Sequence, residues 1–178
     1  CSTWNNAMKV KDHFLSGEVF DLVHNHQYDF YETKPDLSLK ELEEYYKTND
    51  YISHQEKTKD LKSFVYNLVK KYMFRQKYNW IKKFVDNGSW LDFGAGTGEF
   101  LDYLPDKEWN KVAFEPNGKA IQIINNKKIS YISDYQDNEA CFDVITAFHA
   151  IEHVIDIREW FNFIKEISKK DAIVAIAV

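Results

Sequence analysis

The feature that most constrains the fold of this chain is an apolar strand that breaks into three alternating glycines and then resumes as a helix. The strand includes Trp90 and Leu91, and the glycines are Gly94, Gly96 and Gly98. Glycine has no Cβ atom, so the backbone at these positions can take positive φ and lie close against a ligand. The helix that follows offers free amide N–H groups in its first turn. Because the spacing is Gly-x-Gly-x-Gly and not the Gly-x-Gly-x-x-Gly of dinucleotide-binding loops, we predict a loop for another nucleotide-type cofactor.

A second apolar strand, residues 111–115, ends in an acid. Glu115 follows Gly94 by 21 residues and precedes Pro116. In an open α/β sheet the carboxyl ends of neighbouring strands line the ligand crevice, and an acid at the tip of the second strand can accept hydrogen bonds from ribose hydroxyls. We therefore predict that Glu115 is a ribose ligand. The alternative is a surface acid in the turn before Pro116.

A third landmark is the apolar segment that runs through residues 142–148 into His149. Phe148 and His149 stand at the carboxyl end of this predicted strand, where a ligand in such a sheet would lie. The near-neutral intrinsic pKa of histidine suits a general base that removes a proton from a hydroxyl. His149 is thus a candidate catalytic base or a hydrogen-bonding wall, and a purely structural role in the turn is the alternative.

These three landmarks, in this order across residues 89–154, resemble the class I S-adenosylmethionine-dependent methyltransferases. Asp92, two residues before the first glycine, matches the acid of the family's first motif. Glu152, His153 and Val154 are similar to the corresponding run in the ubiquinone-biosynthesis O-methyltransferases, within the broader group that methylates oxygen or carbon of small molecules. The resemblance implies methyl transfer from S-adenosylmethionine to a small-molecule acceptor. It also implies that cofactor contacts come from Asp92, Gly94, Ala95, Gly96, Gly98, Glu115, Pro116, Asp134, Phe148 and His149.

The remaining pattern predicts an α/β fold of the Rossmann-like type. Strands are expected at 89–93, 111–115, 129–132, 142–147 and 172–178, with helices near 97–104, 118–126 and 157–169. Alternation of strands and helices predicts a parallel central sheet with right-handed crossovers. The complete family fold adds a sixth and a seventh strand, so we expect this methyltransferase core, residues 88–178, to be truncated after its fifth strand.

The amino-terminal half is expected to hold a small β element and helices. Residues 18–23 alternate as a short strand should, residues 38–46 begin with a capping box, and apolar positions recur at helical spacing from 57 to 85. Residues 1–36 resemble a zinc ribbon that has lost most of its thiolates, and residues 37–87 would form a helical cap or linker. Because Cys1 and the other candidates, His13, His24 and His26, do not make a zinc-ligand pattern, no metal is predicted. Glu152 and His153 are adjacent and point apart on a helix, so we expect them to support or cap the site and not to share an ion.

Composition excludes several classes of function. Lys and Arg total 23 against 28 Asp and Glu, a net charge of −5, so a nucleic-acid substrate is not expected. With two cysteines and no apolar run of about 20 residues, the chain is expected to be cytoplasmic, without a disulfide framework or membrane span. The oligomeric state stays open. Two other functions also stay open: an inactive S-adenosylmethionine-binding module or partner subunit, and an NAD-type oxidoreductase if the glycine spacing is misread.

Overall fold

The computed structural model describes residues 7–13, 16–34, 61–133 and 142–178. The chain divides into two compact units, Cys1–Thr58 and Lys59–Val178, and each is described by itself. Two predictions lie outside the described residues, the helix at 38–46 and the placement of Asp134, and so does Cys1 of the ribbon-like segment.

The first unit contains an antiparallel sheet of three strands in the order β1-β2-β3. The strands are β1 (Met8–Lys11), β2 (Val19–Asn25) and β3 (Phe30–Lys34). Only the middle strand was expected from the sequence, because the other two are short and carry charged residues at alternate positions. Among the described residues, no group of three or more His, Cys, Asp or Glu side chains could hold a metal ion. The likeness to a zinc ribbon stays a prediction.

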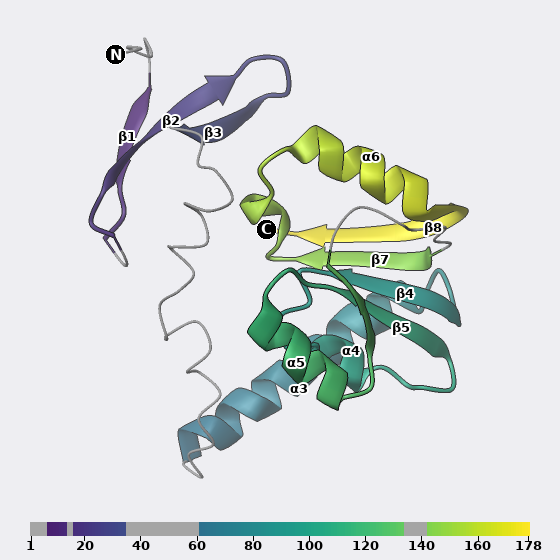
Figure 1. Ribbon diagram of the computed structural model, residues 1–178. Helices are drawn as coiled ribbons and strands as arrows, with labels where there is room; N and C mark the ends of the chain where they lie inside the picture. The colour runs from purple at the N-terminus through teal and green to yellow at the C-terminus, as the bar shows by residue number, and fades with distance from the viewer. Residues whose placement is uncertain (1–6, 14–15, 35–60, 134–141) are drawn as a thin grey trace. The chain divides into compact units, whose positions relative to one another are not determined.

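The second unit is built on a five-stranded sheet in which every pair of neighbours is parallel (Figure 1). The order is β6-β5-β4-β7-β8. The strands are β4 (Gly88–Phe93), β5 (Trp109–Phe114), β6 (Ser130–Ile132), β7 (Phe142–Phe148) and β8 (Ser168–Ala177). This arrangement confirms the predicted Rossmann-like fold. The strand order reverses between β4 and β7, and in open α/β sheets ligands bind at such a switch point, outside the carboxyl ends of the strands.

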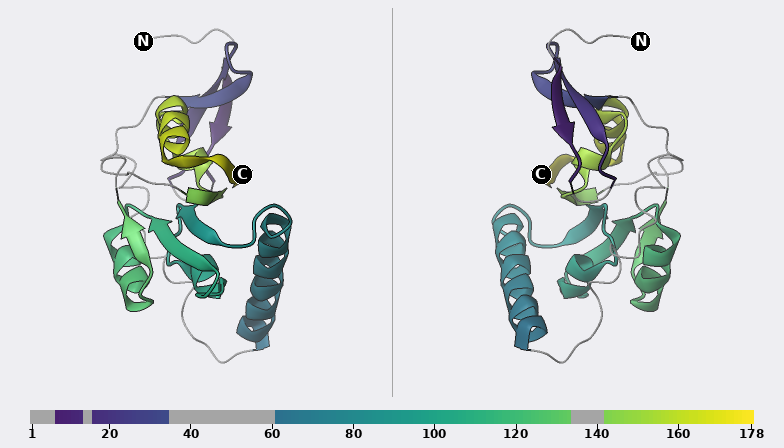
Figure 2. Two further views of the ribbon diagram at one scale, coloured as in Figure 1. Left: turned by 90° about the vertical axis from the view of Figure 1, so that its right-hand side faces the viewer. Right: turned by 90° about the vertical axis from the view of Figure 1, so that its left-hand side faces the viewer.

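Helices cover both faces of this sheet. The face below the sheet in Figure 1 packs on α3 (Leu61–Ile81), α4 (Glu99–Tyr103) and α5 (Gly118–Asn126), and the opposite face packs on α6 (Ile157–Ile167). The side views in Figure 2 place α3 and α5 at opposite ends of the lower layer. Side chains in a strand alternate between faces. Trp90 and Val144 therefore pack in the core with α3, whereas Leu91 and Ile145 pack in the core with α6.

Two boundaries differ from the sequence prediction for local reasons. The helix expected from residue 97 begins at Glu99, because Gly98 takes a left-handed φ of 70° and acts as its N-cap. The last helix ends at Ile167, and β8 starts at once with Ser168, which pairs with Phe142. The charged residues that follow Ser168 made this part of the strand look like the end of a helix.

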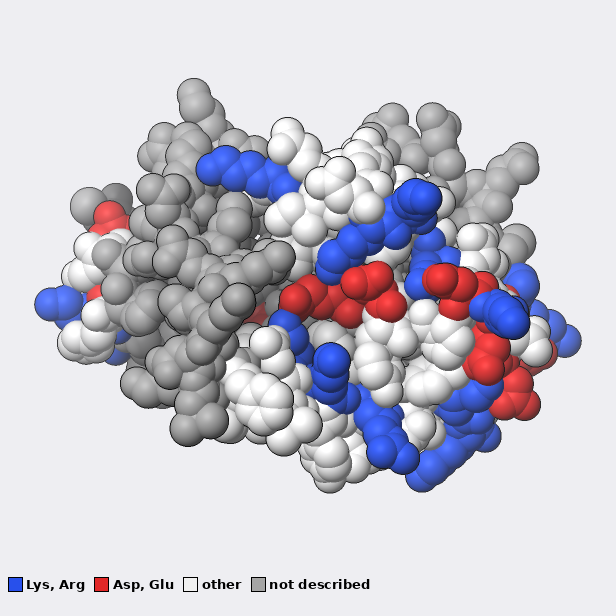
Figure 3. All heavy atoms as spheres, turned by 90° about the horizontal axis from the view of Figure 1, so that it is seen from below, with Lys and Arg blue, Asp and Glu red and all other residues white. Residues whose placement is uncertain are grey.

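The surface of the lower helix layer mixes charges of both signs. Lys70 contacts Glu99 at 2.8 Å, and Lys127 lies 3.7 Å from Asp102. Figure 3, which views this face, shows basic and acidic side chains interspersed over it. Charge pairs near the surface contribute little stability, and side chains of both signs occur on the part of this face that the structure describes.

No helix among the described residues is both long enough and apolar enough to cross a membrane.

Candidate functional site

The glycine loop takes the backbone conformation that the sequence predicted. Gly94, Gly96 and Gly98 have φ of 70°, 53° and 70°, which confirms positive φ at all three positions. The amides of Gly94 and Ala95 both donate to the carbonyl oxygen of Phe114, at 2.9 and 3.1 Å. These hydrogen bonds fold the loop across the carboxyl end of β5, next to β4.

The three glycines differ in what surrounds them. A Cβ atom on Gly94 would lie 2.5 Å from the Cβ of Ala150, and one on Gly98 would lie 3.2 Å from Cγ1 of Ile124. At Gly96 nothing lies within 4 Å of the Cβ position. Close packing thus explains the first and third glycines. The middle one borders open space, where a ligand can approach the backbone.

Glu115 follows β5 directly and binds this loop. Its Oε2 accepts a hydrogen bond from the amide of Gly96, and its Oε1 accepts one from the amide of Asn117, both at 2.9 Å. The side chain is buried, and burial raises the pKa of Glu115 above its usual value, while the two amides act in the opposite direction. Each carboxylate oxygen has a second acceptor position, so the group can still accept hydrogen bonds from two hydroxyls. Pro116, which comes next, is exposed.

Asp92 lies one residue before the end of β4 and is only 6% exposed. The hydroxyl of Thr146 on β7 donates to its Oδ1 at 2.6 Å, and the indole Nε1 of Trp90 donates to that hydroxyl at 3.0 Å. Burial raises the pKa of Asp92 to about 7, although the Thr146 hydrogen bond and the charge of Lys77 lower it. The carboxyl group therefore lies at the switch point with a pKa near neutrality. A cationic group that binds beside it would favour its ionised form.

Phe148 and His149 mark the end of β7. The ring of Phe148 lies 5.6 Å from that of Phe100. His149 has a positive φ of 54°, its amide donates to the carbonyl oxygen of Ala177 at 2.7 Å, and its side chain is 68% exposed. Its Nδ1 lies 3.8 Å from Oε1 of Glu152. Glu152 therefore lies close to the imidazole of His149, which precedes it by three residues.

The carboxyl ends of β4, β5 and β7 hold the predicted site residues that the structure describes: Asp92, Gly94, Ala95, Gly96, Gly98, Glu115, Pro116, Phe148 and His149. Sequence reasoning missed Thr146 and Lys77. A threonine inside an apolar strand gives little local signal. For Lys77 a signal was present, because it falls between Phe74 and Ile81 on the helix stripe that faces the sheet.

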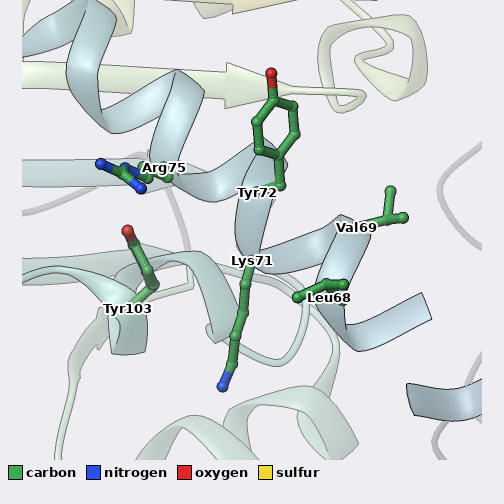
Figure 4. A pocket seen from close by; sticks show the side chains of 6 residues that line it. All are labelled: Leu68, Val69, Lys71, Tyr72, Arg75 and Tyr103. Carbon is green, nitrogen blue, oxygen red and sulfur yellow. The ribbon is translucent and has the colours of Figure 1, made fainter. Parts of the chain in front are cut away.

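One open pocket, with a volume of about 560 Å³, lies apart from these residues (Figure 4). Its lining comes from α3 and from Tyr103 at the end of α4: Leu68, Val69, Lys71, Tyr72, Arg75 and Tyr103. Neither the glycine loop nor Glu115 contributes to it. The candidate site is defined by strand ends and backbone amides, and this pocket is a separate feature of the helix layer.

Comparison with known proteins agrees with this geometry. The family described as "Methyltransferase domain" matches residues 69–178. Coclaurine N-methyltransferase bound to N-methylheliamine and SAH is 17% identical with a TM-score of 0.51, covering 58% of this chain and 34% of that one. The plantazolicin methyltransferase BpumL, in complex with a desmethylPZN analogue and SAH, is 20% identical with a TM-score of 0.50, covering 61% and 45%. The glycopeptide N-methyltransferase MtfA, complexed with sinefungin, is 13% identical with a TM-score of 0.51, covering 58% and 48%.

At these identities the likeness to solved structures shows a common fold. The chain spans about half of the length of the solved structures that it matches. No curated protein matches its sequence.

Proposed function

This chain belongs to the methyltransferase domain family, and from that membership we propose that it binds S-adenosylmethionine at the switch between β4 and β7 and methylates a small-molecule acceptor at oxygen or carbon. Structural neighbours support the cofactor, because coclaurine N-methyltransferase and BpumL hold SAH and MtfA holds sinefungin. The proposed core is residues 88–178. A ribbon-like segment at 1–36 and a helical cap at 37–87 complete the proposed organisation.

The observation that carries the proposal is the hydrogen bond between the buried carboxylate of Glu115 and the amide of Gly96. It joins the tip of β5 to Gly96, which of the three loop glycines is the one that borders open space. A nucleoside placed there would have its ribose hydroxyls beside Glu115 and its remaining chain along the loop. The methionine end would extend toward Asp92, whose carboxyl group suits an ammonium. The further cofactor contacts that we propose are Gly94, Ala95, Gly98, Pro116, Asp134, Phe148 and His149.

The cofactor's sulfonium supplies an activated methyl group and a good leaving group, so the protein has little covalent chemistry to perform. Glu115 and the glycine loop would fix the adenosine end, and Asp92 would fix the amino-acid end. Fixing both ends orients the methyl group toward an acceptor at the carboxyl end of β7. Alignment of two reactants in this way is a major source of rate acceleration.

His149 is the proposed general base for a hydroxyl acceptor. Its side chain is exposed beside the carboxyl end of β7, and Glu152 stands close enough to stabilise the imidazolium after proton uptake. The expected effect of His149→Ala is a kcat about 100-fold lower, the lower end of the usual contribution of a general base, with little change in Kd for S-adenosylhomocysteine. A kcat equal to that of the native enzyme on its hydroxyl acceptor would remove this role from His149.

Titration calorimetry of S-adenosylmethionine and S-adenosylhomocysteine into the purified chain tests the cofactor assignment. We expect a Kd in the micromolar range, roughly −8 kcal/mol. Glu115→Gln should raise the Kd about 10- to 100-fold, because the amide loses one acceptor oxygen and directs N–H groups at a backbone amide. The matched control is Glu166→Gln, an exposed acid on α6, which should bind as the native chain does.

Three results would redirect the proposal. Unchanged binding by Glu115→Gln would remove the ribose contact from that residue. Binding of a nicotinamide cofactor but not of S-adenosylmethionine would establish an oxidoreductase. Cofactor binding without turnover of any acceptor, in the full-length protein as well, would favour a binding module or partner subunit.

A further inference from the structure

Lys77 is a part-buried cation on the inward-facing side of α3. Its neighbours on this side pack into the core: Phe74 lies 5.4 Å from the ring of Phe100, and Tyr78 stacks on Trp90 at 6.3 Å. Within the described part of the chain, the ammonium of Lys77 makes no hydrogen bond or ion pair. Its contact is with the ring of Phe148, whose centroid lies 3.9 Å from Nζ. An ammonium carries three hydrogen-bond donors, and the ring of Phe148 offers them no acceptor oxygen.

The position of this cation relative to the sheet defines what it can bind. Asp92 pairs with Thr146 across β4 and β7, and Phe148 is two residues further along β7 on the same face. Two residues of a strand correspond to about 6.6 Å. Lys77 therefore stands beyond Asp92 in the direction of the carboxyl end of β7. The two side chains influence each other's ionisation without forming an ion pair.

We propose that Lys77 binds the carboxylate at the methionine end of the cofactor, opposite Asp92, which binds the ammonium. This inference rests on the function proposed above and adds a positioning residue to it. The amino-acid end of S-adenosylmethionine carries an ammonium and a carboxylate on the same carbon atom. A charge-assisted hydrogen bond of about 2.8 Å from each side would hold the ligand's ammonium against Asp92 and its carboxylate against Lys77.

The electrostatics of these two side chains agree with this arrangement. Burial lowers the pKa of Lys77 and raises that of Asp92, so each charged form is disfavoured where it stands. A zwitterion between them supplies an opposite charge to each group at once. Phe148 would hold the stem and ammonium of Lys77 at the mouth of the crevice through the cation–π contact, which limits the freedom lost when the ligand binds.

The test compares two ligands with Lys77→Met. One is S-adenosylhomocysteine, and the other is its decarboxylated analogue, which keeps the adenosine, the thioether and the ammonium. Lys77→Met should weaken binding of S-adenosylhomocysteine about 10- to 100-fold and change binding of the analogue about twofold or less. Lys77→Arg should retain most of the affinity for S-adenosylhomocysteine. Lys71→Met, an exposed lysine of the same helix, is the matched control and should bind both ligands as the native chain does.

Binding of the analogue by Lys77→Met also reports that this variant is folded. An equal loss of affinity for both ligands would overturn the inference, because it would give Lys77 a structural role. Unchanged affinity for S-adenosylhomocysteine would overturn it too. If the native chain bound neither ligand, the proposed function would fail and this inference with it, whereas either of the first two results leaves the proposed function standing.

Discussion

Asp92 should make the stability of this chain depend on pH in a direction opposite to that of an ordinary paired carboxylate. Its pKa is raised from its ordinary value of 3.8 to about 7 in the folded state. Well below pH 3.8 the group is protonated in both states. As the pH rises toward 7, the unfolded chain ionises first, so the free energy of unfolding falls through this window. Asp92→Asn keeps the shape and an acceptor oxygen for Thr146, and it does not titrate.

The magnitude follows from the two pKa values. Between pH 5 and pH 8 the native chain should lose about 2 to 3 kcal/mol relative to Asp92→Asn. Urea denaturation of both proteins at the two pH values measures this difference, and the other titrating groups cancel because both proteins share them. Asp171→Asn, an exposed aspartate on β8, should show no such change with pH. The compared quantity is the free energy of unfolding of the native chain minus that of Asp92→Asn. If this difference is the same at pH 5 and pH 8, or is larger at pH 8, the reasoning is refuted.

Three further substitutions test the glycine loop and the hydroxyl that binds Asp92. Gly94→Ala should lower the free energy of unfolding by about 3 kcal/mol, since φ is positive and the new Cβ would lie 2.5 Å from Ala150. Gly96→Ala should lower it by about 1 kcal/mol, because φ is positive but the Cβ position is open. Equal losses for the two variants in urea denaturation would contradict this difference. Thr146→Val leaves the Trp90 indole N–H without its acceptor and should cost about 2 to 3 kcal/mol. That loss should be larger at pH 8 than at pH 5, because the ionised carboxylate needs the hydroxyl donor, and a loss independent of pH would argue against the hydrogen bond.

The central sheet could be predicted from the sequence because its strands are short apolar runs between clear turn signals. The strand Phe142–Phe148, for example, has apolar residues at five of its seven positions, as expected of a strand covered on both faces. The strands Met8–Lys11 and Phe30–Lys34 escaped prediction because they are short and rich in charged residues, and no residue of either strand is fully buried. Both strands pair with Val19–Asn25, and this pairing gives them a strand structure that their own sequences do not specify.

The candidate site divides in the same way. Local sequence fixes the positive φ of the glycine loop, because only glycine takes that conformation without strain. The raised pKa of Asp92 arises instead from burial, and it is partly offset by a hydrogen bond from a hydroxyl 54 residues away in the sequence. The contact of Lys77 with Phe148 likewise joins a helix to a strand 71 residues later. Such long-range contacts depend on how the elements pack, and no local pattern specifies them.

The packing that forms the core also determines where the proposed charged groups stand. Tyr78 stacks on Trp90, and this contact places the adjacent residue, Lys77, over the end of β7. Trp90 in turn donates to Thr146, the residue that binds Asp92. The cation and the carboxyl group are therefore positioned by the same indole ring, one from its face and the other through its N–H. A substitution of Trp90 should consequently disturb cofactor affinity as well as stability, although the ring itself lies in the core and not in the crevice.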